Sequence, residues 1–277
     1  SIEELSILGD IGMAVDVTVY DDGRHREPAV HESPFGATLL FTPGALLEAG
    51  AGGTPADWNE VVRDGEIDRA RYTALYERRL LPLLKFAAST SSAAGRAALV
   101  TVPGLGCGQF AGRFRGRMAA HLRDAIGDIL ARNADQLAGL RTVWFDPYRE
   151  CENERREIGE ISYLVRPLVQ NTPGLPQLCR PADYEEPGDD YSNCDLYSMV
   201  AWDHVSWPGN DFYAGVRATD DGVKAAATDA MYAMTGFAGR YDPQTHAYLP
   251  PAEAPNWEWL VRTHDLRIRA DENVVVV

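Results

Sequence analysis

The chain has 277 residues, of which 45% are hydrophobic, and it carries a formal net charge of −15 at pH 7. Its length suits one large globular domain. The charge repels phosphate backbones and anionic bilayers over most of the surface, so we expect neither nucleic acid nor a membrane as a general partner. A small anionic ligand would need a local site that overcomes this field.

Cysteine and histidine spacing excludes two further classes of protein. The four cysteines (Cys107, Cys151, Cys179 and Cys194) stand far apart, with no CxxC pair, and the six histidines form no HxH or HExxH pattern. A disulfide scaffold and a zinc protein are therefore not expected. The opening residues SIEELSILGD lack a basic segment followed by an apolar stretch, so we expect no signal peptide and a cytoplasmic protein with free thiols.

Strands and helices are predicted in an order that indicates the fold class. The predicted strands, in chain order, are residues 15–20, 37–42, 97–102, 142–145, 161–167 and 196–202. The predicted helices are residues 67–88, 113–138 and 221–234, and residues 170–193, rich in Pro, Gly and Asp, are predicted as a loop. This alternation predicts an α/β fold in three layers, in which ligands bind at the carboxyl ends of the strands.

A glycine-rich loop follows the predicted strand 97–102, whose continuous apolar run is typical of the centre of a sheet. Glycines let backbone amides turn toward one point, and the N-terminus of a following helix adds positive charge, so the loop predicts a cradle for a diphosphate. The candidate binding residues are Gly104, Gly106, Cys107, Gly108, Gln109, Phe110, Ala111 and Gly112. The GK[ST] of a P-loop is absent, and a tight turn whose glycines serve only packing stays an alternative.

An acidic segment near the start of the predicted helix 221–234 is the second candidate site. Asp211, Asp220, Asp221 and Asp229 fall within 19 residues, and such carboxylates can perform general acid–base chemistry or hold a divalent cation. The structural alternative is that Thr219 caps the helix, that the first two helical aspartates complement its dipole, and that Asp229 is solvated.

Together the two segments resemble a macrodomain. GLGCGQFAG (residues 104–112) is similar to the diphosphate loop of poly(ADP-ribose) glycohydrolases and their relatives. GNDFYAGVRATDDGVKAAATDAM (residues 209–231) resembles the MavL-type, arginine-specific ADP-ribosyl hydrolase macrodomains known from bacterial effectors. The resemblance implies a macrodomain-like α/β/α sandwich with a mixed central sheet, forming a single domain over residues 1–277 with N-terminal and C-terminal extensions.

The resemblance also implies an activity and a set of site residues. It implies a hydrolase that removes ADP-ribose from a protein side chain, arginine in the first place, with an ADP-ribosylated protein such as ubiquitin as partner. The glutamate-bearing signature of the poly(ADP-ribose) enzymes, a GGG followed by QEE, is absent, which favours mono-ADP-ribosyl arginine. Asp211, Asp220, Asp221 and Asp229 are implied near the distal ribose, with Asp211 and Asp229 as first choices for catalysis, and Asn210, Phe212 and Thr219 near the ligand.

Two questions stay open at this point. A module that binds ADP-ribose without turnover would share the glycine loop and need no acidic cluster, and an ADP-ribose phosphate phosphatase is a further alternative. The sequence forces no metal ligand set, so Mg²⁺ stays a candidate cofactor held by the aspartates.

Overall fold

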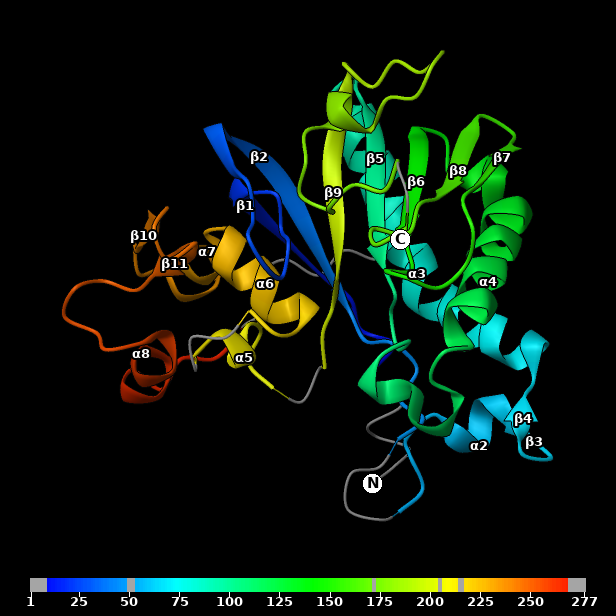
Figure 1. Cartoon of the computed structure of the whole chain (residues 1–277), viewed down its shortest axis with the longest axis horizontal. Coiled ribbons are helices and arrows are strands. Elements are labelled where there is room, and N and C mark those ends of the chain that lie inside the picture. The colour runs from blue at the N-terminus through cyan, green and yellow to red at the C-terminus, as the bar shows by residue number, and fades with distance from the viewer. Residues whose placement is uncertain (1–8, 49–52, 171–172, 204–205, 214–216, 269–277) are drawn as a thin grey trace.

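The computed structural model describes residues 9–48, 53–170, 173–203, 206–213 and 217–268. These residues form a seven-stranded mixed sheet (Figure 1). In spatial order its strands are β1 (Met13–Asp21), β2 (Val30–Thr42), β9 (Cys194–Ala201), β5 (Ala97–Pro103), β6 (Leu140–Asp146), β8 (Ile161–Val165) and β7 (Glu154–Ile158). The five inner strands run parallel, and the edge strands β1 and β7 pair antiparallel to their neighbours.

Side chains alternate between the two faces of the sheet and build two hydrophobic cores. Val100 and Val143 pack with α3 (Arg69–Ala93) and α4 (Met118–Asn133), which cover one face (Figure 1). Leu99 lies in the opposite core, which is closed by the loop 173–193 and by α6 and α7. The predicted three-layer α/β/α sandwich with a mixed sheet is therefore confirmed.

The remaining elements lie around this sandwich, and most were not predicted from the sequence. They are α2 (Trp58–Val61), β3 (Val62–Arg63), β4 (Glu66–Ile67), η1 (Gln109–Phe114), η2 (Ala134–Gln136), η3 (Pro181–Tyr184), α5 (Asn210–Tyr213), α6 (Asp220–Ala227), α7 (Ala230–Thr235), β10 (Arg240–Asp242), β11 (Ala247–Leu249) and α8 (Trp257–Thr263). Phe212, Met231 and Trp257 centre a third core that joins α5–α7 to β11 and α8. Within the described ranges, no helix has the length and hydrophobicity to cross a bilayer.

The helix predicted over 67–88 is observed as α3, which extends to Ala93, and the other two predicted helices differ more from the observed ones. The helix predicted from residue 113 begins at Met118, because Gly112 adopts φ = +50° and residues 109–114 form a 3₁₀ helix instead. The helix predicted over 221–234 is broken into α6 and α7 at Thr228, which forms a β-bridge with Val19. Pairing with the edge strand β1 thus outweighs local helix propensity there.

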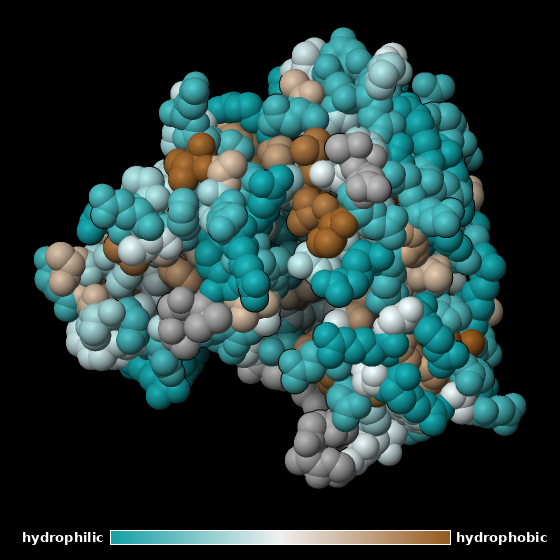
Figure 2. Space-filling view, in the orientation of Figure 1, coloured by the Kyte–Doolittle hydropathy of each residue, from teal (hydrophilic) through white to brown (hydrophobic). Residues whose placement is uncertain are grey.

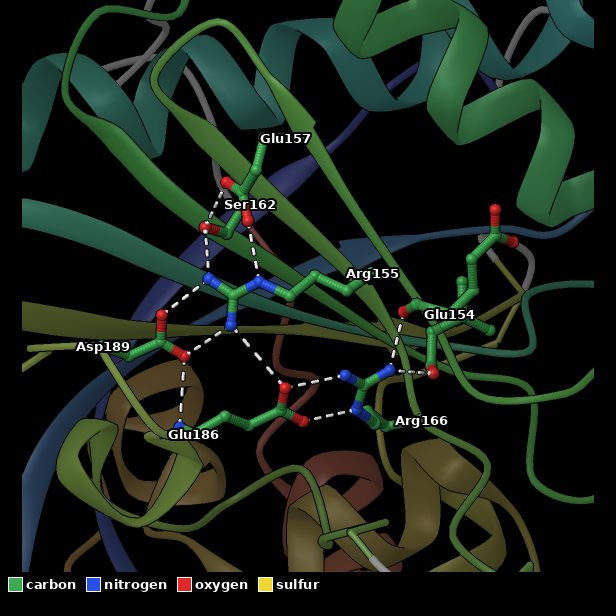
Figure 3. Close-up of polar contacts among 8 residues, drawn as sticks. Glu154, Arg155, Glu157, Ser162, Arg166, Glu186 and Asp189 are labelled. Carbon is green, nitrogen blue, oxygen red and sulfur yellow. Dashed lines mark hydrogen bonds and ion pairs between the residues drawn. The ribbon is translucent and has the colours of Figure 1, made fainter.

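A network of ion pairs fastens the loop 173–193 to the edge of the sheet (Figure 3). Arg155 on β7 forms a two-pronged pair with Asp189, with N···O distances of 2.9 and 2.7 Å. Arg166, directly after β8, pairs in the same way with Glu186 at 2.6 and 2.8 Å. Arg166 also donates to the carbonyl of Glu154, so a loop of irregular backbone is held in one place.

We predict that Glu186→Ala destabilises the fold far more than Glu157→Ala. Loss of Glu186 leaves the guanidinium of Arg166, only 7% exposed, without its carboxylate, which costs about 3 kcal/mol. Glu157 is 56% exposed in its pair with Arg155, so its loss costs less than about 1 kcal/mol. Urea unfolding of both variants measures the difference, and equal midpoints would contradict this role of the network.

Candidate functional site

A cleft of about 480 Å³ opens where parallel strands end. It lies beyond the carboxyl ends of β5, β6 and β9, which is where ligands bind in α/β sheets. Its wall includes Gly104, Cys107 and Gly108 after β5, Asp146 at the end of β6, and Asp220 at the start of α6. The face seen in Figure 2 is hydrophilic over most of its area and is hollowed near its centre. Both segments singled out in the sequence therefore contribute to one cleft.

The glycine loop rests on a second loop, residues 43–48, at very close range. A Cβ atom on Gly44 would lie 2.0 Å from the backbone nitrogen of Gly106, so only glycine allows this approach. Gly106 itself has φ = +70°. The Tyr76 hydroxyl joins the two loops, because it donates to the Leu105 carbonyl at 2.7 Å and accepts from the Ala45 amide at 2.9 Å.

A buried ion pair holds this second loop. Arg79 and Asp57 are 1% and 2% exposed in their side chains, and their N···O distance is 2.8 Å. Arg79 also donates to the Gly44 carbonyl at 3.2 Å, and Asp57 accepts from the Leu46 amide at 2.7 Å. Because each charge is paired and hydrogen-bonded, the pair fixes the loop on which the glycine loop rests.

The predicted binding residues of the glycine loop separate into two groups. Gly104, Cys107 and Gly108 line the cleft, and burial holds the pKa of the Cys107 thiol well above its usual value. The other candidates are not among the described lining residues: Gly106, Gln109, Phe110, Ala111 and Gly112. The sequence predicted that a long helix begins directly after the loop and adds positive charge from its N-terminus. This prediction is wrong, because α4 begins at Met118 and its Ala119 amide donates to Glu150.

The four candidate aspartates occupy different environments. Asp220 lines the cleft, and its Oδ2 accepts from the Ala201 amide at 2.9 Å. Asp211 is exposed on α5, and Asp221 is buried with its Oδ2 on the Gly209 amide. Asp229 accepts from the Thr18 amide at 2.6 Å, and so ties α7 to β1. Asp220 is thus the aspartate that the structure brings beside the glycine loop.

The three neighbouring binding candidates lie outside the described lining of the cleft. Asn210 is exposed on α5, and Phe212 is buried in the C-terminal core. Thr219 caps α6, since its hydroxyl accepts from the Gly222 amide at 3.1 Å. This last contact is the capping role that the sequence offered as a structural alternative.

Sequence reasoning missed three polar residues behind and inside the cleft. Asp146 is 3% exposed, and burial raises the pKa of its carboxyl group to about 6. Gln177, from the loop 173–193, donates to Asp146 at 3.4 Å, and Lys224 donates to the Gln177 side-chain oxygen at 2.8 Å. The position of Asp146 at the end of a predicted strand, before a proline, was a usable signal. The other two carried none.

The rim of the cleft carries positive and aromatic side chains. Arg115, Tyr148 and Arg149 line it, and the guanidinium of Arg149 lies 5.2 Å from the centre of the Tyr148 ring. His25 meets Tyr148 edge-on at 6.4 Å. Such a rim suits an anionic ligand with a planar ring. In the described part of the chain, no three His, Cys, Asp or Glu side chains are grouped so as to hold a metal.

A mixed sheet between helical layers, with a glycine loop and carboxylates at its carboxyl edge, is the arrangement of a macrodomain. A family model described as "Macrodomain effector MavL" matches residues 1–254, and the chain belongs to this family. None of the curated proteins matches the chain. Membership in the family indicates a function related to ADP-ribose, whereas the likeness of the loop to poly(ADP-ribose) glycohydrolases stays a prediction.

We predict that Asp221 makes the stability of the protein fall as pH rises. Burial raises the pKa of Asp221 from 3.8 to about 8, so the folded state favours the protonated form. The stabilisation is complete below pH 3.8 and is lost as pH rises through 8, by up to about 1.4 kcal/mol per unit.

Asp221→Asn keeps an acceptor for the Gly209 amide and does not titrate. Unfolding free energies of both proteins should therefore diverge from pH 5 to pH 8, in favour of the variant. A constant difference across this range would show that the carboxyl group does not change its protonation on unfolding.

Proposed function

We propose that this chain is a hydrolase that removes ADP-ribose from a protein side chain, with arginine as the preferred linkage. The observation that carries the proposal is that Asp220 and the glycine loop wall the same cleft. A volume of about 480 Å³ lies in the range of small-molecule sites. Family membership supports ADP-ribose as the ligand.

The diphosphate is proposed to lie on the glycine loop. Among the described residues, the backbone amide of Gly108, which lines the cleft, has no acceptor, so it is free to bind a phosphate oxygen. Arg115 and Arg149 at the rim add positive charge in a chain whose net charge is −15. The Tyr148 ring, 44% exposed, offers a stacking surface for the adenine.

Asp220 is proposed as the carboxylate that acts at the distal ribose. Cleavage of an N-glycosidic bond passes through an oxocarbenium-like state, which a nearby carboxylate stabilises directly or by activating water. Asp146, in the same cleft, adds a second carboxyl group. Two acidic side chains also favour a cationic group beside them, which supports a modified guanidinium over a neutral or anionic linkage.

A module that binds ADP-ribose without turnover is the second candidate function. Both carboxylate oxygens of Asp220 already accept hydrogen bonds, from the Ala201 amide and from Lys224. Each oxygen of Asp220 thus has one acceptor position already occupied, which favours a fixed binding contact over activation of water. Tight ADP-ribose binding without release from any modified protein would support this alternative.

We predict that Asp220→Asn lowers kcat for release of ADP-ribose from an arginine-modified protein by about 100-fold or more. Affinity for free ADP-ribose, measured by calorimetry, should change little, because the glycine loop is untouched. The matched control is Asp128→Asn, on the exposed side of α4 in a pair with Arg69, which should keep the wild-type kcat.

The same assay should include arginine-, glutamate- and serine-linked substrates, with and without EDTA. Release from arginine in the presence of EDTA is the expected result, and loss with EDTA would indicate the magnesium alternative. If Asp229→Asn abolishes release and Asp220→Asn does not, the choice of Asp229 that the family resemblance favours is correct. The cleft beside Asp220 is then not the catalytic site.

A further inference from the structure

A lysine is buried behind the cleft, where an unpaired ammonium group would be strongly destabilising. Lys224 on α6 is 1% exposed. Its Nζ donates to Gln177 Oε1 at 2.8 Å, to Asp220 Oδ1 at 3.1 Å and to the Met199 carbonyl at 3.3 Å. An ammonium group has three hydrogens, so these three oxygens satisfy it completely.

The ammonium group determines which way the Gln177 amide points. Lysine can only donate, so Gln177 must present its oxygen to Lys224. The amide nitrogen is then directed toward Asp146 Oδ2, at 3.4 Å. A neutral or acceptor side chain at position 224 would remove this constraint and allow the amide to rotate.

The same contact holds the carboxylate of Asp220. One Asp220 oxygen is fixed by the Ala201 amide at the end of β9, and the other by Lys224 from its own helix. The carboxyl groups of Asp220 and Asp146 are therefore joined by one path, which runs through Lys224 and Gln177. Both carboxyl groups and Gln177 line the cleft, whereas Lys224 is not among its described lining residues.

We propose that Lys224 is a positioning residue, whose buried ammonium group holds Asp220 and Gln177 in the orientations that the reaction at the cleft requires. This assignment rests on the proposed hydrolase function. Lys224 acts through its neighbours, without touching the substrate. The relative position and orientation of two carboxyl groups on different elements, Asp220 on α6 and Asp146 on β6, are thereby fixed.

Three carboxyl groups surround the segment of α6 that carries Lys224. Asp220 and Asp221 share its helix, and Asp146 faces it across Gln177. Removal of a cation from this set favours the neutral forms of the carboxyl groups. The acidic limb of the pH–kcat profile should therefore move to higher pH when the charge is removed, which loss of stability alone would not produce.

The test compares kcat, KM and the pH profile of the wild type, Lys224→Met, Lys224→Arg and Thr228→Val on an arginine-modified protein. The stoichiometry of a calorimetric titration with ADP-ribose gives the fraction of molecules in each sample that can bind the ligand, and these are called competent molecules. Thr228→Val is the control for stability: Thr228 lies next to α6, is fully buried and donates to the Lys224 carbonyl, but does not line the cleft.

Lys224→Met should lower kcat per competent molecule by about 100-fold, the scale of a misplaced catalytic group, with KM within about threefold of the wild type. The acidic limb of its pH–kcat profile should move to higher pH. In Lys224→Arg, which keeps the charge, the limb should lie close to its wild-type position. Thr228→Val should lower the melting temperature and keep kcat per competent molecule.

An unchanged kcat in Lys224→Met, with a wild type that releases ADP-ribose, would overturn the positioning role alone. A wild type that releases none from any linkage would refute the hydrolase function and this assignment with it. A fall in kcat that Thr228→Val reproduces would reduce Lys224 to a structural role.

Discussion

The parallel run of β9, β5 and β6 is the constraint on which the site depends. Because parallel strands end at the same edge, Pro103, Asp146 and Ala201 meet there although they lie far apart in the sequence. The glycine loop follows β5, and the segment that carries Asp220 follows β9. A cleft with amides on one side and carboxylates on the other results from this topology.

Buried cations stand behind both walls of the cleft. Arg79 pairs with Asp57 and fixes the loop under the glycine loop, and Lys224 pairs with Asp220. In each case the buried charge is fully paired. Removal of one partner would therefore leave the other as an unpaired buried charge, which is strongly destabilising. Such pairs contribute little net stability, but they specify one arrangement of the groups that face the ligand.

The local pattern of the sequence predicted six of the seven strands of the sheet, all but β7, and one half of the site. Apolar runs such as residues 97–102 are buried on both faces, so their strands were recognisable, and the glycine loop followed one of them. The break at Thr228 was not predictable, because it depends on a bridge to Val19 from a distant strand. Gln177 and Lys224 were missed for a related reason: their roles come from contacts with each other, and nothing in their own neighbourhood indicates these.

Diffraction from crystals soaked in ADP-ribose tests the central claim most directly, namely that the glycine loop and Asp220 bind opposite ends of one ligand. The account predicts electron density in the cleft, with the diphosphate within hydrogen-bonding distance of the Gly108 amide and the distal ribose beside Asp220. Density for the whole ligand elsewhere, with the cleft holding only solvent, would contradict it.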